Sequence, residues 1–393
     1  MRRAIDLAKR GWGQTAPNPM VGAVVVRGDH IVGEGWHARF GEPHAEAAAL
    51  DAAGPLAKGA TVYVSLEPCA HQGKTPPCTR ALIEAGVSRV VIGALDPNPK
   101  ASGGAARLRD AGIDVVTGID ERRALEADPA FFFSFGAKRP WITLKLALTI
   151  DGAIADAAGG SRWITGRRAR AAAHDLRAGH DAVAVGIGTV LSDNPQLTVR
   201  DAPAPRISPR RVIFDRHART PLDSALVRTA RDVPVIVVAE HPQARATRAL
   251  EEAGVTVLRT SSLYNGLEHL KSEGIRSLLV EGGARLTGAL MEQSLIDRLV
   301  IFQGPIVLGS GAQNAFAFTN GTPIGQAHRF RVLERRAFGD DSMIVYRRTT
   351  GGLQADQRRT EPENSERRTT GGQRRTEPEN SERRTRRTRP DRA

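Results

Sequence analysis

The hydrophobic pattern of the first 118 residues alternates between short apolar runs and segments with an apolar residue every three or four positions. The runs are typical of buried strands, and the longer spacing is typical of amphipathic helices. Gly28-Asp29 lies between two of the runs and predicts a hairpin turn. Strands that alternate with helices of ~10 residues favour helices around a largely parallel sheet, so an α/β sandwich is predicted. The predicted helices span 2–10, 43–53, 79–85 and 105–111, and the predicted strands span 21–26, 61–65, 89–93 and 114–117, with one more strand ending near Trp36.

A second α/β region begins at Trp141, after a polar helical stretch at 121–128 and an aromatic cluster at 131–135. These intervening residues predict a link between two domains. We therefore divide the chain into a first domain over 1–120, a linker over 121–140, a second domain over 141–346 and a tail over 347–393. The second domain is predicted to contain helices at 166–178, 245–253, 262–272 and 284–292 and strands at 142–148, 182–186, 211–214, 233–239, 255–258, 277–280, 298–305 and 341–346.

The tail changes the meaning of the strong positive charge. The 393 residues carry a formal net charge of +13, but 14 arginines against eight acidic residues give the tail +6 and leave +7 for the rest. The tail has almost no apolar residue after Leu353, and the sequence of 357–369 recurs at 373–385. A short polar repeat has no apolar face to bury, so a disordered, basic tail is predicted. The net charge is therefore weak evidence for a nucleic-acid partner.

Composition limits the class of protein further. A 40% share of hydrophobic residues and a 25% share of charged residues are typical of globular domains. Apolar runs such as 233–239 and 295–302 are shorter than the ~20 residues of a membrane helix. The first residues lack the apolar core and cleavage site of a secretory signal. We expect a cytoplasmic protein with no membrane partner, where two cysteines indicate metal binding or catalysis rather than a disulfide.

Both cysteines fall in one loop, downstream of a His-x-Glu pair. His44 and Glu46 open a predicted helix, Cys69 follows a strand, and Cys78 begins the next helix. One imidazole and two thiolates suit tetrahedral zinc, and three protein ligands leave a fourth position for water. Glu46 would not reach the metal together with His44, so we expect it to transfer protons between the reacting water and a leaving amine. A His-x-Glu pair followed by Pro-Cys is typical of zinc nucleobase deaminases.

Three other residues are further candidates for contacts in this site. His71 lies between the cysteines, but a fourth ligand would close the site to water, so we expect a loop or substrate contact there. Lys74 belongs to the same loop. Asn18 stands between two prolines that stiffen its loop, which is also the setting of an ordinary turn asparagine.

These motifs, in this order and spacing, resemble the deaminase domain of the bifunctional riboflavin-biosynthesis enzymes. That family has an enlarged loop between its cysteines, as in the eight residues that separate Cys69 from Cys78. The resemblance also covers Pro17-Asn18-Pro19, Glu67-Pro68-Cys69 and the Asp96–Pro99 segment. It implies a cytidine-deaminase-like α/β/α sandwich with His44, Cys69 and Cys78 as zinc ligands, Glu46 as the catalytic residue and Asn18 as a substrate contact.

The second domain has no G-x-G-x-x-G at a strand-to-helix turn, so a Rossmann site is not indicated. Gly186 and Gly188 follow one predicted strand, and Gly282-Gly283 follow another. Glycines at such positions let backbone N–H groups approach a phosphate, although most glycine turns have no such role.

Longer motifs of the second domain resemble the reductase domain of the same family. They are Lys145–Gly152, Ser161–Thr165, Gly188–Val190, Leu197–Arg200 and Glu281–Gly283. The resemblance implies a dihydrofolate-reductase-like α/β domain that uses NADPH. The implied NADPH contacts are Ala147, Trp163, Thr189, Asp193, Gly283, Ala284, Arg285, Leu286, Thr287, Gly288 and Ala289. The implied substrate contacts are Ser161, Arg177, Leu197, Arg200 and Glu281.

These residue types suit the implied ligands. Guanidinium groups pair bidentately with phosphate, and Trp163 offers a flat apolar surface to the cofactor. Reduction of a sugar also needs a proton donor. Lys145 and Asp151 lie on or just after one predicted strand, and the sequence leaves the choice between them open.

The resemblance implies two successive reactions. The first domain would remove the 2-amino group of 2,5-diamino-6-ribosylamino-4(3H)-pyrimidinone 5′-phosphate by hydrolysis with zinc. The second would reduce the ribosyl chain with NADPH, giving 5-amino-6-(ribitylamino)uracil 5′-phosphate. Because the family commonly forms homo-oligomers, a homo-oligomer is expected.

Two other functions stay open at this point. A nucleic-acid base deaminase with a basic RNA-binding tail would bind RNA in a salt-dependent manner and would not bind NADPH. A non-catalytic binding protein stabilised by zinc would need a closed site with four ligands.

Overall fold

The computed structural model describes residues 1–72, 76–317 and 321–349. Five strands form the first sheet, in the order β2-β1-β3-β4-β5. β3, β4 and β5 run parallel, whereas β1 is antiparallel to both β2 and β3. The sheet is mixed rather than largely parallel, because Gly28, with a φ of 59°, turns the chain straight back after β1. The strands are β1 (Gly22–Arg27), β2 (His30–Trp36), β3 (Thr61–Leu66), β4 (Arg89–Ala94) and β5 (Asp114–Thr117).

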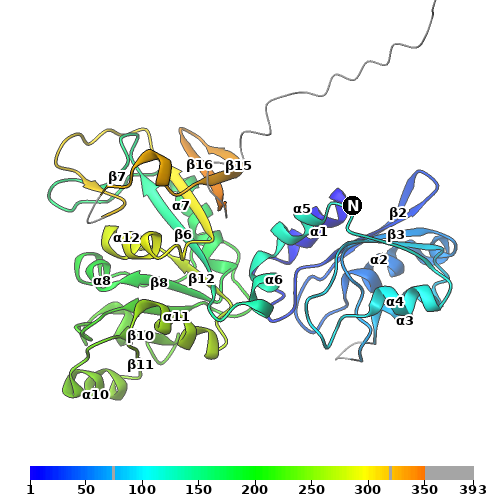
Figure 1. The fold of residues 1–393 in the computed structure, drawn as a ribbon, viewed down its shortest axis with the longest axis horizontal. Coiled ribbons are helices and arrows are strands. Elements are labelled where there is room, and N and C mark those ends of the chain that lie inside the picture. Colours follow the sequence, from blue (N-terminus) through cyan, green and yellow to red (C-terminus); the bar gives the residue numbers. More distant parts are fainter. Residues whose placement is uncertain (73–75, 318–320, 350–393) are drawn as a thin grey trace, which may run out of the picture. The chain divides into compact units, whose positions relative to one another are not determined.

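Helices cover both faces of this sheet (Figure 1). Successive strand residues point to opposite faces. Ala23 and Val25 share one core cluster with residues of α2, α3 and α4, whereas Val24 packs with α1 on the other face. Ala124 of α5 also packs with α1. The predicted α/β/α sandwich is confirmed. The helices are α1 (Arg2–Ala8), α2 (Ala45–Ala53), α3 (Cys78–Glu84), α4 (Gly104–Asp110) and α5 (Glu121–Ala127).

Helix α2 packs very closely on β2 because two glycines of β2 face it. A Cβ atom on Gly35 would lie 2.4 Å from both the Ala45 carbonyl oxygen and the Ala49 nitrogen. A Cβ atom on Gly33 would lie 2.3 Å from the Ala49 carbonyl oxygen. The close approach fixes the amino end of α2, where His44 is the N-cap.

Nine strands form the second sheet, in the order β11-β10-β9-β8-β12-β6-β13-β16-β15. The strands from β11 to β13 in this order are all parallel, and β16 is antiparallel to both β13 and β15. Their carboxyl ends therefore lie along one edge of the sheet, where ligands bind in open α/β sheets. The strands are β6 (Trp141–Leu148), β8 (Ala182–Gly186), β9 (Arg210–Phe214), β10 (Val235–Ala239), β11 (Thr256–Arg259), β12 (Ser277–Val280), β13 (Arg298–Gln303), β15 (Phe330–Phe338) and β16 (Asp341–Arg348).

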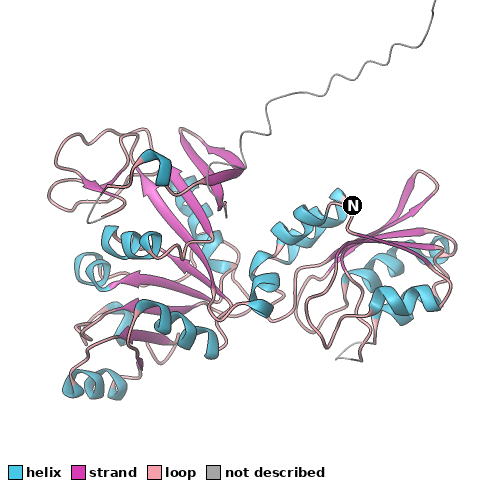
Figure 2. Cartoon of the chain, in the orientation of Figure 1, coloured by secondary structure: helices cyan, strands magenta, loops and turns pink. Residues whose placement is uncertain are grey.

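Helices also cover both faces of the second sheet, as Figure 2 shows. Leu267 of α11 and Leu290 of α12 belong to the core cluster on one face. Val190 of α8, Leu226 of α9 and Leu250 of α10 belong to the cluster on the other. The helices are α7 (Arg167–Ala178), α8 (Ile187–Asp193), α9 (Ala225–Arg228), α10 (Ala244–Glu252), α11 (Leu263–Ser272) and α12 (Ala284–Glu292), and a separate ribbon pairs β7 (Ala153–Ala155) with β14 (Gln313–Asn314).

Several elements differ from the sequence prediction. The aromatic cluster at 131–135 lies in a helix, α6 (Pro129–Gly136), whose N-cap Asp128 accepts a hydrogen bond from the Phe131 N–H. β15 was not predicted, because its charged residues obscure a strand pattern. The last strand continues two residues beyond 346 because Arg347 pairs with β13 and β15.

The linker helix α5 also contacts the second sheet. Glu126 forms ion pairs with Arg298, Arg331 and Arg347, which come from β13, β15 and β16. Both sheets belong to one compact unit of the chain. The tail predicted to be disordered lies, from residue 350 onward, outside the described residues. No helix in the described ranges is long and apolar enough to cross a membrane.

Substitution of Gly35 by alanine is expected to lower the free energy of unfolding by ~1–3 kcal/mol, because the new methyl group would collide with the backbone of α2. Gly136→Ala is the matched control, since a Cβ atom there meets no atom within 4 Å. Denaturant unfolding of both variants measures the difference. An unchanged midpoint for Gly35→Ala would contradict the close packing.

Candidate functional site

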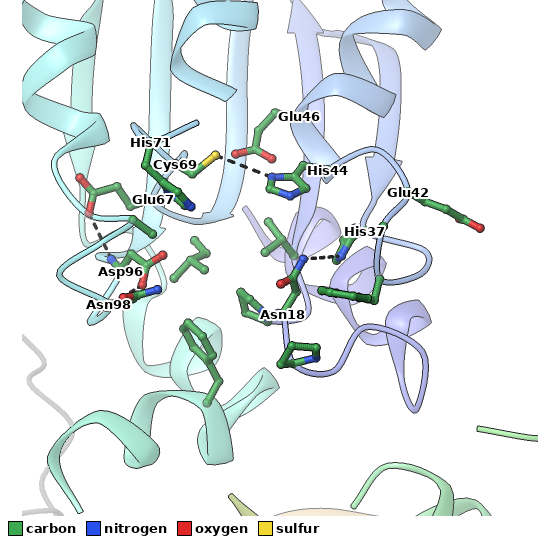
Figure 3. A pocket seen from close by; sticks show the side chains of 18 of the residues that line it. Asn18, His37, Glu42, His44, Glu46, Glu67, Cys69, His71, Asp96 and Asn98 are labelled. Carbon is green, nitrogen blue, oxygen red and sulfur yellow. Dashed lines mark hydrogen bonds between the residues drawn. The ribbon is translucent and has the colours of Figure 1, made fainter. Parts of the chain in front are cut away.

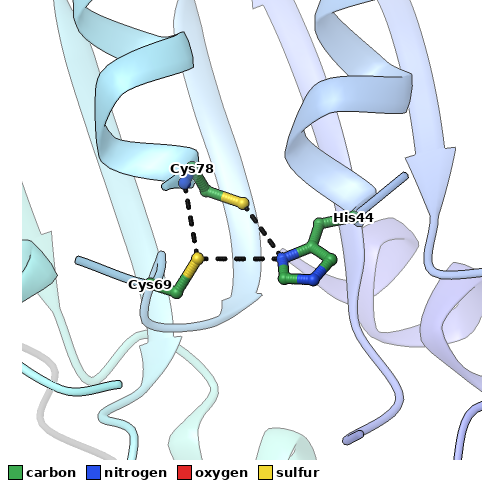
Figure 4. A group of neighbouring side chains, drawn as sticks. All are labelled: His44, Cys69 and Cys78. Atoms are coloured by element: carbon green, nitrogen blue, oxygen red, sulfur yellow. Dashed lines mark hydrogen bonds between the residues drawn. The ribbon is translucent and has the colours of Figure 1, made fainter. Parts of the chain in front are cut away.

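Three side chains from separate elements converge at the carboxyl end of β3 (Figure 4). His44 precedes α2, Cys69 follows β3, and Cys78 is the first residue of α3. The Nδ1 atom of His44 lies 3.7 Å from Cys69 Sγ and 3.3 Å from Cys78 Sγ. The three ligand atoms lie within 4.8 Å of one another. A nitrogen and two sulfurs at this separation fit zinc.

The protonation of the two thiols favours a metal. A hydrogen bond from Cys78 lowers the pKa of Cys69 to about 4, so its sulfur is a thiolate at neutral pH. The backbone N–H of Cys78 also donates to this sulfur, at 3.4 Å. The same pairing raises the pKa of Cys78, so the two thiols share one proton that a bound metal would release.

Glu46 lies beside the cluster without belonging to it. The side chain is 3% exposed, and it lines the same cavity as His44 and Cys69. Burial raises the pKa of its carboxyl group. A raised pKa brings a carboxyl group closer to the pH at which it can both accept and return a proton.

The cluster opens into a cavity of about 340 Å³. Figure 3 shows Glu67, His71, Asp96 and Asn98 on one wall and His37 and Asn18 on the other. His71 is exposed and lines the cavity but is not part of the three-residue group. Among the described residues the site has three ligands, which differs from the closed site of a purely structural zinc protein. Lys74 lies outside the described residues.

His37 is a site residue that the sequence analysis missed. It is 2% exposed, and burial lowers its pKa, so the ring is neutral. Its Nδ1 lies 3.1 Å from the Pro43 carbonyl oxygen and must donate to it, so Nε2 accepts from the Asn18 amide at 3.2 Å. This bond holds the Asn18 side chain at the cavity wall. The sequence feature that could have revealed His37 is its position directly after the predicted strand that ends at Trp36.

Glu67 belongs to the Glu67-Pro68-Cys69 motif, but its role was not predicted from the sequence. It is 6% exposed and directly follows β3. Its carboxylate accepts hydrogen bonds from the backbone N–H groups of Asp96, at 3.1 Å, and Ala105, at 2.9 Å. It thereby fixes the turn that carries Cys69 against the loop after β4 and the start of α4.

The second sheet carries a largely shielded group of charges at the carboxyl end of β12. Glu281 forms a bidentate pair with Arg177, at 2.5 and 2.9 Å, and lies 4.0 Å from Lys145 Nζ. Burial alone would raise the pKa of Glu281, but the charges of Arg177 and Lys145 lower it to about 2. Burial lowers the pKa of Lys145. Three of the residues expected in a reductase site are therefore brought together.

The two glycine turns of this sheet also meet. A Cβ atom on Gly186 would lie 3.6 Å from Leu286, and one on Gly283 would lie 3.6 Å from the Thr189 hydroxyl. The starts of α8 and α12 therefore lie side by side. The connection before α7 reaches the same region, since Arg162 donates to the Asp193 carbonyl oxygen at 3.1 Å.

The other predicted residues of the second domain have varied surroundings. Four of them are half-buried, namely Ala147, Ser161, Ala284 and Ala289. Arg285 is exposed, and Trp163 is 64% exposed. Leu197 is buried in a core cluster. Thr287 is fully buried, and Gly288 packs against the Ala317 carbonyl oxygen. Arg200 is exposed, and its side chain bonds to Gln196 rather than to the Glu281 group.

The structure separates the two candidate proton donors. Asp151 is exposed and accepts hydrogen bonds from the Thr149 hydroxyl and from the Leu308 and Gly309 N–H groups. The Thr149 and Gly309 bonds lower its pKa, so it stays ionised. Lys145 lies inside the charged group.

Fold and sites together define a two-domain α/β protein with a zinc-deaminase-like site in the first domain and a cluster of paired charges at the carboxyl end of β12 in the second. Residues 1–94 match the family model described as "Cytidine and deoxycytidylate deaminase zinc-binding region", and residues 140–343 match "RibD C-terminal domain". The chain belongs to the RibD family of bifunctional deaminases and reductases of riboflavin biosynthesis. Its deaminase domain is zinc-binding, and its reductase domain uses NADPH.

The similarity to individual proteins covers nearly all of the described chain. The riboflavin biosynthesis protein RibD of Aquifex aeolicus is 43% identical over 351 residues, which are 88% of this chain and 97% of that protein. RibD of Acinetobacter baumannii has a solved structure with a TM-score of 0.76 and 39% identity, covering 89% of this chain and 98% of its own. The solved structure of the Thermotoga maritima deaminase/reductase has a TM-score of 0.76 and 36% identity. The match covers 89% of this chain and 97% of that one. These matches confirm the predicted family and do not favour an RNA-binding deaminase.

The three-residue cluster predicts which substitutions remove the metal. Cys78→Ser is expected to hold well below one zinc per chain, because it replaces a soft thiolate ligand with a hydroxyl group. His71→Ala should keep one zinc per chain, since His71 is outside the cluster. Metal analysis of the purified variants measures both. A Cys78→Ser protein with stoichiometric zinc would contradict the ligand assignment.

Proposed function

We propose that residues 1–120 deaminate 2,5-diamino-6-ribosylamino-4(3H)-pyrimidinone 5′-phosphate and that residues 141–346, joined by 121–140, reduce its ribosyl chain. The convergence of His44, Cys69 and Cys78 beside the buried Glu46 supports the first reaction. The solved Thermotoga maritima relative carries the same two activities in its name. The cavity of about 340 Å³ is within the range of small-molecule sites.

The residues of the first site have distinct roles in this proposal. His44, Cys69 and Cys78 would hold zinc, and a bound zinc ion would act as the Lewis acid that activates water. Glu46 takes the proton from the attacking water and returns it to the leaving amine. Asn18, held by His37, presents its side-chain oxygen to the pyrimidine. His71 contacts the substrate at the opposite wall.

Glu46→Gln is expected to abolish ammonia release from the diaminopyrimidine substrate, because the amide cannot accept the proton. NADPH oxidation with the deaminated intermediate should be unchanged, since Glu46 belongs to α2 beside the first sheet and the Glu281 group belongs to the second sheet. The two assays are run on one preparation. Loss of both activities in a folded variant would contradict two independent sites.

In the second domain, NADPH supplies the hydride when bound, and the chain orients the reactants. We assign the nicotinamide cofactor to the paired helix starts at Thr189 and Gly283 and to Ala147, Trp163 and Asp193. The residues that follow Gly283, from Ala284 to Ala289, belong to α12 and hold that helix start in place. Ser161, Arg200, the backbone at Leu197 and the Arg177–Glu281 pair hold the substrate.

Lys145 is the proposed proton donor of the reduction. It lies 4.0 Å from Glu281, and its lowered pKa makes it a stronger acid than a solvated lysine. The carboxylate of Glu281 keeps the ammonium group in place. Asp151 is assigned a structural role, because its oxygens are occupied by the 308–309 backbone.

Lys145→Met is expected to lower kcat of NADPH oxidation ~100-fold or more, the usual contribution of a general acid. Asp151→Asn should stay within a few-fold of the original enzyme. A donor must be protonated, so wild-type kcat should fall as pH rises through a pKa below the ordinary lysine value of ~10.4. A pH profile without this alkaline limb would reject Lys145.

We further propose that the protein forms a homo-oligomer. β15 ends the strand order of the second sheet, so among the described residues one of its edges is unpaired. Exposed apolar side chains, including Val332 on this strand, Val307 and Ile324, are the kind of surface that a second subunit covers. Light scattering of the full chain measures the mass, and a monomer would contradict this proposal.

A further inference from the structure

The cavity of the deaminase site has an uneven distribution of charge. Four carboxyl groups line it, those of Glu42, Glu46, Glu67 and Asp96. The pyrimidine end of a substrate would lie beside Glu46 at the metal. A 5′-phosphate carries about two negative charges and needs a permanent cation elsewhere in the cavity. Among the described lining residues, one lysine or arginine side chain is present, that of Arg276.

Arg276 comes from the other domain. It directly precedes β12, at the end of the strand opposite to Glu281. Its backbone N–H donates to the Asp181 carboxylate at 2.8 Å, and that carboxylate also accepts from the Ser277 N–H. These bonds fix the main chain at the amino end of β12. The side chain then extends to the deaminase domain, where Nη1 donates to the Pro17 carbonyl oxygen at 2.7 Å.

The guanidinium group retains capacity to bind an anion. It has five N–H donors, and the bond to Pro17 uses one of them. The partner in that bond is a neutral carbonyl, and no ion pair among the described residues includes Arg276. The charge is therefore available to a ligand in the cavity. A planar guanidinium group matches the oxygens of a phosphate monoester, and an ammonium group matches them less well.

The surroundings of Arg276 are also positive. A second cavity, of about 270 Å³, shares Pro17, Asn18, Phe131 and Arg276 with the first. Its charged lining residues are four arginines and two aspartates, namely Arg206, Arg210, Arg276, Arg298, Asp128 and Asp181. Both aspartates accept backbone N–H bonds. Arg298 is paired with Glu126, so the other three arginines and the two aspartates leave a small excess of positive charge at the end of the deaminase cavity where Arg276 lies.

We propose that Arg276 binds the phosphate of the deaminase substrate, so that a residue of the reductase domain completes the deaminase site. The inference rests on the proposed deaminase function. Asn18 links the two parts of this arrangement, because its loop accepts the Arg276 bond and its side chain is held by His37 beside the metal cluster. Arg276 acts on binding of the substrate and takes no part in proton transfer.

The test compares two substrates, the phosphorylated diaminopyrimidine nucleotide and the same compound without its phosphate. Arg276→Gln is expected to raise KM for ammonia release from the phosphorylated substrate about 10- to 100-fold, with kcat near the original value. KM for the compound without phosphate should be unchanged. Arg276→Lys should recover part of the loss, because it keeps the charge without the planar group.

Arg210→Gln is the matched control. Arg210 lines the second cavity but not the first, and its side chain donates to the Glu273 carbonyl oxygen. It should leave both KM values unchanged. Zinc content and NADPH oxidation with the deaminated intermediate should be unchanged in every variant, which shows that the chain is folded.

Two outcomes would overturn the inference. One is an unchanged KM for the phosphorylated substrate in Arg276→Gln, and the other is an equal rise in KM for both substrates, which would indicate a displaced Pro17 loop. Calorimetric titration in a Glu46→Gln background repeats the comparison without turnover. If the wild-type protein bound the nucleotide but released no ammonia, the proposed function would be wrong. If the protein bound the nucleotide equally well with and without the Arg276 side chain, only this inference would be wrong.

Discussion

A carboxylate buried at the carboxyl end of a parallel strand organises each of the two sites. Glu67 directly follows β3, and Glu281 directly follows β12. Burial of a charge is unfavourable unless hydrogen bonds or opposite charges compensate for it. The surrounding chain must therefore bring donors to both carboxylates. That requirement determines where the neighbouring loops and side chains lie.

The two carboxylates are compensated differently, and their functions differ accordingly. Glu67 receives backbone N–H groups from the loop after β4 and from α4, so it fixes main chain and holds the Cys69 turn in place. Glu281 receives a guanidinium and an ammonium group, so it fixes the side chains of Arg177 and Lys145. The first arrangement is structural support for a metal site. The second keeps a lysine with a lowered pKa at the carboxyl end of the sheet, where we propose that the substrate binds.

Most elements could be predicted because their local pattern agrees with their final environment. β5 and β12, for example, have the predicted bounds. The exceptions have physical reasons. The consecutive aromatic residues of α6 lack helical spacing, and packing rather than periodicity decides their conformation. β15 is an edge strand with three consecutive charged residues, Glu334 to Arg336, and its conformation depends on pairing with β16. The hairpin at Gly28 was predicted, but its consequence for the sheet was not: it sets β1 antiparallel to both of its neighbours, so the sheet is mixed and not largely parallel.

The sequence by itself determined the family and allowed the zinc ligands and Glu46 to be predicted, because their chemistry depends on residue identity and on short spacings. Tertiary structure decided which distant groups meet. It placed Lys145 rather than Asp151 beside Glu281, brought His37 to Asn18, and carried Arg276 from the second sheet to the loop at Pro17. Contacts of this kind depend on strand order and on the packing of one layer against another. The local spacing of residues does not predict strand order or layer packing.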